Sequence, residues 1–92
     1  MFDYRYNDEK NELLIAKYGF GFDELMEIVS QGGVFRILQH PNQNQYSHQQ
    51  VLHIPYNKYI YIIPFVIESD GTWFLKTFYP SRKAKKEYNN GE

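Results

Sequence analysis

Residues 59–84 read YIYIIPFVIESDGTWFLKTFYPSRKA, and this stretch decides the fold class that we expect. Two runs rich in β-branched and aromatic residues, 59–67 and 73–79, have the composition of β-strands. Between them Asp70 and Gly71 form a dipeptide that is typical of hairpin turns. The stretch therefore predicts two antiparallel strands that are adjacent in one sheet.

Proline residues mark two further points in this stretch. Pro64 lies inside the first run and indicates a sheet edge or a β-bulge, because proline has no N–H to donate to a ladder. Pro80 ends the second run, and Ser81 after it is a candidate cap for a short final helix. Pro80 and Ser81 thus predict where the sheet ends and a basic helix begins.

The chain before the hairpin changes its hydrophobic period. Residues 1–6, MFDYRY, alternate aromatic and polar side chains, which predicts a short strand. Asn7 is a candidate cap for a helix that Gly19 ends, because glycine readily adopts the left-handed conformation of a helix stop. A second helix is predicted over 22–31, before the Gly-Gly pair at 32–33.

Two more strands, at 34–39 and 51–56, complete the predicted order of strand, two helices, four strands and a helix. We expect an α+β fold in which a four-stranded antiparallel sheet carries helices on one face or at one end. At this length the chain predicts a single domain over residues 1–92, with residues 88–92 as a frayed tail.

Charge is unevenly distributed although the formal net charge is only −1. Residues 1–30 carry seven acidic and three basic side chains, whereas residues 72–92 carry five basic and two acidic ones. Such asymmetry lets a nearly neutral protein present one basic face to nucleic acid. Aromatic residues make up 18% of the chain, which excludes a disordered protein. The absence of a long apolar run predicts a soluble, cytoplasmic protein with no membrane partner.

Histidine, cysteine and serine give little support to several kinds of catalytic site. The chain has no cysteine, and its three histidines are expected to be polar-loop residues rather than zinc ligands: His40, His48 and His53. No serine lies in a nucleophile elbow, and the glycine pairs do not have phosphate-loop spacing. The residues therefore give little support to a zinc site, a phosphate-binding loop or a serine hydrolase.

Scission of RNA without a metal is the chemistry that the residues favour. The reaction needs a group to deprotonate the 2′-hydroxyl, cations to neutralise the phosphorane, and a group to protonate the 5′-oxygen. Arg82 is the first candidate for the phosphate, with Lys83 and Lys76 in support, whereas Tyr79, His48 or Tyr88 would transfer protons or stack a base.

Structural explanations compete with these roles. Lys85 and Lys86 lie near the end of the predicted final helix, where the helix dipole favours cations. Lys76 fits the polar face of a half-buried strand equally well. Arg82 is different, because a cation in the first turn of a helix is mildly disfavoured. Something other than helix formation should therefore account for Arg82.

The two ends of the chain resemble BrnT-type toxins. Residues 2–29, FDYRYNDEKNELLIAKYGFGFDELMEIV, resemble the family's opening strand and helices, and residues 74–88, FLKTFYPSRKAKKEY, resemble its closing strand and Ser-Arg-Lys-Ala motif. Tyr18 stands where the family often has histidine. The similarity extends over about residues 2–88, and its middle part is less specific.

The resemblance implies a RelE-like ribonuclease toxin of a type II toxin–antitoxin module, without a cofactor. It implies a cognate antitoxin with a DNA-binding domain, so that operator DNA is bound only through the complex, and RNA as the substrate. By motif match it also carries the basic signature onto Arg82 and Lys83, and Lys17 corresponds to the family's basic residue before the first glycine. We expect the RNA-binding residues to be Lys17, Lys85, Lys86 and Tyr88.

Two alternatives remain open from the sequence. In the first, the protein is not an enzyme and its basic face only binds an acidic partner segment. In the second, it is an RNA-binding domain without toxicity.

Overall fold

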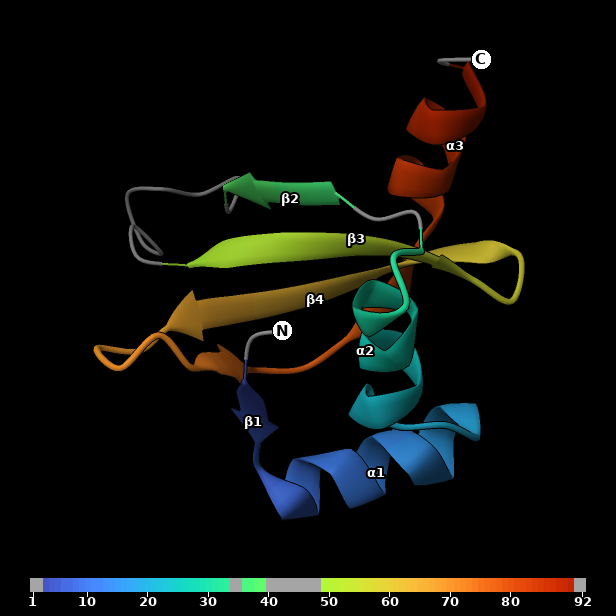
Figure 1. The fold of residues 1–92 in the computed structure, drawn as a ribbon. Coiled ribbons are helices and arrows are strands. Elements are labelled where there is room, and N and C mark those ends of the chain that lie inside the picture. The colour runs from blue at the N-terminus through green and yellow to red at the C-terminus, as the bar shows by residue number, and fades with distance from the viewer. Residues whose placement is uncertain (1–2, 34–35, 40–48, 91–92) are drawn as a thin grey trace.

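The computed structural model describes residues 3–33, 36–39 and 49–90, and for 87–90 the backbone alone (Figure 1). These residues form an α+β domain with two helices near the start, a sheet, and a third helix at the end. The elements are β1 (Tyr4–Tyr6), α1 (Asp8–Tyr18), α2 (Phe22–Ser30), β2 (Arg36–Gln39), β3 (Gln50–Tyr56), β4 (Tyr59–Ile67), β5 (Trp73–Leu75), β6 (Tyr79–Ser81) and α3 (Arg82–Asn90).

Six strands of the described chain form one sheet in the order β1-β5-β4-β3-β2, and β6 pairs with β4. All pairs are antiparallel except β1 with β5, which are parallel. The expectation of four antiparallel strands was therefore wrong. The first strand joins the sheet beside β5, and the last predicted strand is divided into β5 and β6.

The division of the last strand is a β-bulge opposite Pro64. Leu75 pairs with Phe65, whereas Tyr79 pairs with Ile62, so the register with β4 shifts by one residue between the two segments. The Lys76 N–H donates to the Pro64 carbonyl at 2.9 Å at this point. The sequence correctly indicated a bulge here, but not an edge, because β4 is paired on both sides.

Packing explains the bulge. Leu75 and Phe78 are each 1% exposed and both belong to the main core. Residues three apart in a regular strand point to opposite faces, so both side chains reach the same core only if an extra residue is inserted between them. The insertion also changes which later residues face away from that core.

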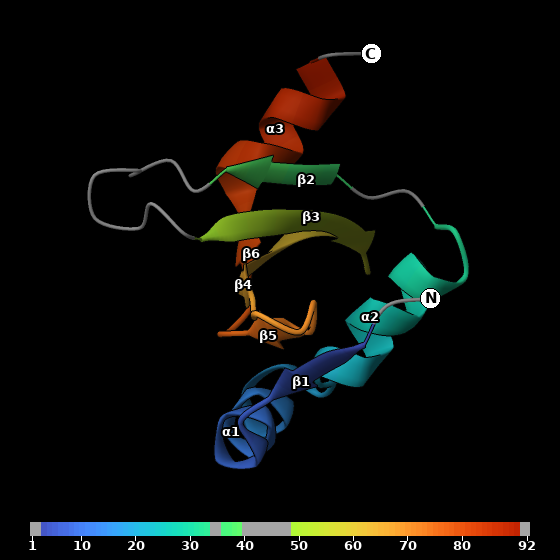
Figure 2. The same cartoon turned by 60° about the vertical axis from the view of Figure 1, so that its left-hand side comes forward.

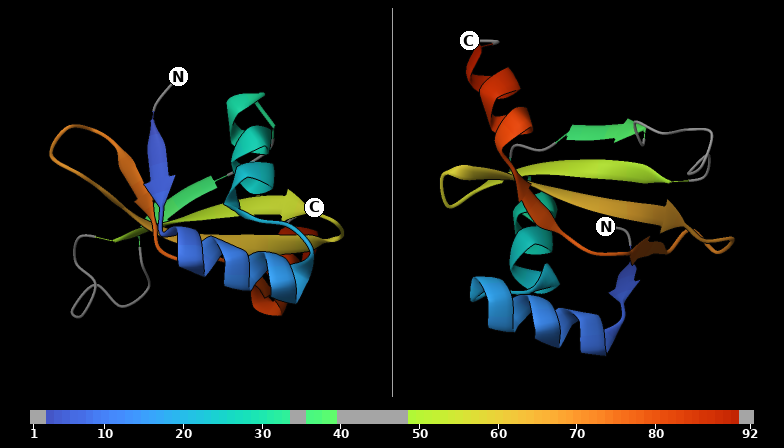
Figure 3. Two further views of the ribbon diagram at one scale, coloured as in Figure 1. Left: turned by 90° about the horizontal axis from the view of Figure 1, so that it is seen from below. Right: turned by 180° about the vertical axis from the view of Figure 1, so that it is seen from behind.

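The helices cover both faces of the sheet, not one face or end as expected. On one face, α1 and α2 pack on side chains such as Leu52, Ile63 and Phe65. On the other face, Ala84 of α3 packs on Val51, Ile60 and Ile62. Figures 2 and 3 show α3 on the side of the sheet away from α1 and α2. We call this second side the pocket face, defined by Val51, His53, Ile60 and Ile62.

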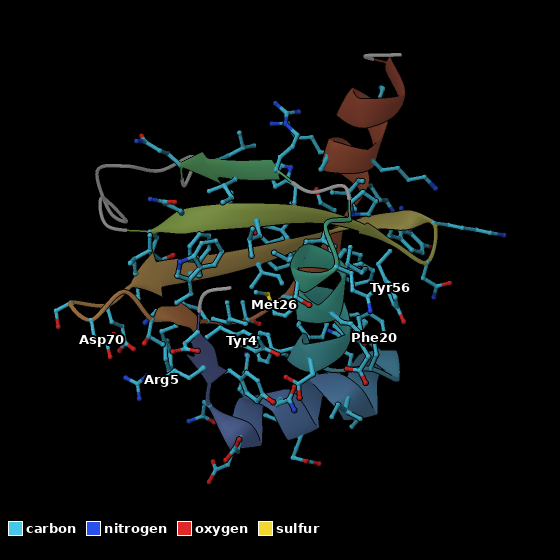
Figure 4. The ribbon with its side chains drawn as sticks, viewed as in Figure 1. Tyr4, Arg5, Phe20, Met26, Tyr56 and Asp70 are labelled. Carbon is cyan, nitrogen blue, oxygen red and sulfur yellow. The ribbon has the colours of Figure 1, made fainter. Side chains whose placement is uncertain are left out.

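The helix ends follow the sequence signals. The Asn7 side chain accepts a hydrogen bond from the Lys10 N–H at 2.9 Å, and Gly19 ends α1 with φ +88°. The Asn11 side chain then accepts from the Phe22 N–H at 2.9 Å, which joins α1 to the start of α2. The connection leaves no room for a larger residue at Gly21, where an added Cβ would lie 2.5 Å from Asn11 Oδ1. From α2, Met26 points between the helix and the sheet (Figure 4).

β1 is fixed to α2 through two phenols. The hydroxyls of Tyr4 and Tyr6 donate to the two carboxylate oxygens of Asp23, at 2.7 and 2.9 Å. Burial, and then the hydrogen bond to Asp23, raises the pKa of Tyr6 to about 12 and raises the pKa of Tyr4 as well. The folded protein thus holds both phenolic protons more tightly than the unfolded chain does.

This difference predicts a loss of stability in alkali. Below pH 10, the usual tyrosine value, both states are protonated and the contribution is complete. As the pH rises from about 10 towards 12, the unfolded chain releases its protons first and the free energy of unfolding falls. Urea denaturation at about pH 9 and about pH 11.5 measures the fall. The Tyr4→Phe, Tyr6→Phe double variant should show a shallower fall, and an unchanged fall would contradict this assignment.

The β3–β4 turn contains a second testable feature. Asn57 and Lys58 both have positive φ, 52° and 72°, as a type I′ turn between Tyr56 and Tyr59 requires. Asparagine tolerates this conformation, but lysine is strained in it by roughly 1 kcal/mol. We expect Lys58→Gly to raise the free energy of unfolding by about that amount. Lys58→Ala is the control in chemical denaturation and should give no gain, because alanine keeps the strain.

Candidate functional site

A pocket of ≈ 260 Å³ opens on the pocket face, between α3 and the strands β2, β3, β4 and β6. Both apolar and polar side chains line it. The lining residues are Leu38, Gln39, Val51, His53, Ile62, Tyr79, Ser81, Lys83 and Ala84. Such a mixture of apolar surface and a few polar groups is typical of small-ligand sites.

Strand register places the polar side chains in a row. His53 of β3 and Tyr79 of β6 both pair with Ile62 of β4, so the three side chains leave the sheet on the same side. His53 is 9% exposed and Tyr79 is 42% exposed. Arg36 of β2 pairs with His53 and extends the row on the other side. The row therefore combines a buried imidazole, an accessible phenol and a cation.

The start of α3 brings Lys83 to the same pocket. The Ser81 hydroxyl accepts a hydrogen bond from the Ala84 N–H at 3.1 Å, which caps the helix as the sequence predicted. Ala84 is 4% exposed and fixes the first turn against the sheet. Lys83 is exposed at the rim, next to the end of the helix that attracts anions. The geometry offers a negatively charged group one cation and the helix N-terminus.

The predicted catalytic residues are only partly together. Tyr79 and Lys83 line the pocket. Arg82 is exposed and does not line it, and within the described part of the chain its guanidinium has no ion pair. Lys76 is also outside the lining, with its Nζ 5.1 Å from the centre of the Phe74 ring. His48 lies outside the described residues.

The predicted RNA-binding lysines are dispersed. Lys17 is on α1, where its Nζ lies 5.3 Å from the centre of the Tyr18 ring, so it is on the side of the sheet away from the pocket. Lys85 makes a similar contact with Tyr59, and Lys86 is exposed on α3. The backbone of Tyr88 is part of α3, and its side chain is not among those that the structure describes.

His53 is the titratable pocket residue that the sequence analysis missed, and Arg36 lies beside it in β2 without lining the pocket. The expectation of a polar-loop histidine was wrong for His53, which is buried within β3. His40 lies outside the described residues. A signal was present, because His53 alternates with Leu52 and Ile54 and therefore faces away from the main core. The residues that pair with His53 on β2 and β4 could not be predicted without the strand register.

Neither a metal cluster nor a membrane span is found in residues 3–33, 36–39 and 49–90. No group of three or more His, Asp or Glu side chains there could hold a metal ion. No described helix is long and apolar enough to cross a membrane.

Comparisons with protein-family models, curated proteins and solved structures found no match for this chain. The resemblance to BrnT-type toxins thus remains an expectation from the sequence.

The cap on α3 makes a direct prediction for the pocket. Ser81→Ala removes the acceptor for the Ala84 N–H and should lower the free energy of unfolding by about 1 kcal/mol. Chemical denaturation measures the loss. Ser69→Ala, in the exposed β4–β5 loop, is the matched control and should change stability by less than about 0.5 kcal/mol. Equal effects in the two variants would exclude the cap.

Proposed function

We propose that the protein is a metal-independent endoribonuclease, and that it acts as the toxin of a type II toxin–antitoxin module. The observation that carries this proposal is the pocket in which His53, Tyr79 and Lys83 come together. Two of these groups transfer protons and the third is a cation. The BrnT-like and RelE-like features of the sequence support the same function.

The chemistry needs no group beyond those present. The 2′-oxygen of the RNA attacks the adjacent phosphorus, and the bond from phosphorus to the 5′-oxygen breaks. One proton leaves the 2′-hydroxyl and one is delivered to the departing 5′-oxygen, which gives a 2′,3′-cyclic phosphate and a 5′-hydroxyl. We assign these transfers to His53 and Tyr79. Lys83 and the N-terminus of α3 stabilise the added negative charge of the phosphorane.

The rest of the pocket suits a nucleotide. Val51, Leu38 and Ile62 give the base an apolar surface, while Lys83 places positive charge near its phosphate. This arrangement favours an unpaired strand, because a base within a duplex is stacked and cannot enter a pocket.

A partner is part of the proposal. A toxin of this kind needs a cognate antitoxin, and we propose an antitoxin whose other domain binds operator DNA. The exposed cations of α3, Arg82, Lys83 and Lys86, would suit an acidic segment of that partner. A small DNA-binding protein encoded in the neighbouring gene would support the pairing.

The proposal predicts a steep loss of RNA cleavage in pocket variants. With a single-stranded RNA in the presence of EDTA, Lys83→Ala should lower the cleavage rate about 10²-fold, since it removes charge stabilisation in the transition state. Tyr79→Phe keeps the ring and loses the O–H, so it should also lower the rate about 10²-fold. Gel analysis of end-labelled RNA measures both rates.

Matched variants make the test specific. Lys10→Ala removes an exposed cation from α1, on the other side of the sheet from the pocket, and should leave the rate unchanged. Arg82→Ala distinguishes between two assignments of the main phosphate ligand. The sequence pattern assigns this role to Arg82, whereas the pocket assigns it to Lys83 and makes Arg82 secondary. Intact RNA with the wild-type protein, together with unimpaired growth when the gene is induced alone, would overturn the proposal.

A further inference from the structure

A second cationic group lies beside β5, away from the pocket. Its residues are Arg5, Phe74 and Lys76, which we call the Phe74 cluster. The Arg5 guanidinium carbon lies 5.3 Å from the centre of the Phe74 ring, and Lys76 Nζ lies 5.1 Å from it. One half-buried aromatic side chain thus holds two cations in place.

The Phe74 cluster lies on the pocket face. Phe74 pairs with Val66 of β4 and with Arg5 of β1, and Val66 alternates with the core residue Phe65. The bulge after Lys76 then returns Tyr79 to this same face. Along β4, Ile62 below the pocket and Val66 below the cluster are separated by about 13 Å. One extended strand of nucleic acid is long enough to contact both.

The two cations differ in how far they are neutralised. Arg5 donates to both carboxylate oxygens of Glu68, from Nε at 2.7 Å and from an Nη atom, and Asp70 is in the same hairpin (Figure 4). Lys76 is exposed, and no carboxylate of the described residues forms an ion pair with it. Glu68 interacts with the Lys76 charge only at longer range, so Lys76 is the less neutralised of the two cations and the one more available to an outside anion.

We propose that the Phe74 cluster is a second RNA contact, in which Lys76 binds a phosphate of the strand whose reacting nucleotide occupies the pocket. Phe74 keeps the Lys76 side chain positioned and offers apolar surface to a neighbouring base. This inference rests on the proposed ribonuclease function. It assigns Lys76 to holding the strand and not to the reacting phosphate.

Salt dependence of binding tests the phosphate contact. The probe is a 2′-O-methyl oligouridine of about twelve nucleotides, which has no 2′-hydroxyl to react, with binding followed by fluorescence anisotropy. For single strands each phosphate contact adds roughly 0.7 to the slope of log K against log salt. Lys76→Ala should lower the slope by that amount, and Phe74→Leu should weaken binding about tenfold. Lys10→Ala, which removes an exposed lysine from α1 on the opposite side of the sheet, should change neither quantity.

Substrate length separates this inference from the function on which it rests. A dinucleotide fills the pocket but does not reach the Phe74 cluster, so Lys76→Ala should cut a dinucleotide normally and the longer RNA more slowly. If the wild-type protein cuts RNA and Lys76→Ala has an unchanged slope, the second contact is wrong and the function stands. If the wild-type protein neither cuts RNA nor binds the probe, both proposals fall.

Discussion

The structure depends on β4, a strand that is hydrogen bonded along both edges. Residues 59–65 of β4 pair with β3, while β5 and β6 share its other edge. The register of β5 and β6 against β4 is fixed by the core on the side of α1 and α2, where Leu75 and Phe78 must both be buried. Pro64 lies opposite the resulting bulge and has no backbone N–H. The register shift therefore falls at a residue of β4 that needs no acceptor on the neighbouring strand.

The bulge has a consequence for function. A shift of one residue in register turns every later side chain to the other face of a sheet. Tyr79 and Ser81 face the pocket because the shift precedes them, and Phe74 faces the same way because it precedes the shift. A regular strand over 73–81 would place Phe78 in the pocket and Tyr79 in the core. The packing of one phenylalanine therefore sets the chemical groups that the pocket presents.

The two faces of the sheet carry different kinds of interaction. Under α1 and α2, Phe78 packs against a cluster of aromatic rings that includes Phe20 and Phe22, at centroid distances of 5.4 and 5.2 Å. The pocket face has a small apolar cluster under α3 and leaves the remaining surface open to polar groups. The large core stabilises the fold, which leaves the other face available for charged and titratable side chains. The basic end of the chain reaches that face through α3.

The sequence by itself determined the features that depend on neighbours within a few residues. Asn7, Gly19 and Ser81 act at helix ends, and Asp70 and Gly71 form the hairpin loop, because caps and tight turns are closed by local hydrogen bonds. Tyr79 and Lys83 were predicted because they lie close together in the chain. The tertiary structure alone decided that His53 joins them, that Arg82 and Lys76 lie outside the pocket, and that α3 covers the opposite face from α1. The physical reason is that strand register is set by the burial of side chains that are distant in the sequence. Because side chains alternate between the two faces of a sheet, a register shift of one residue moves each later side chain to the other face.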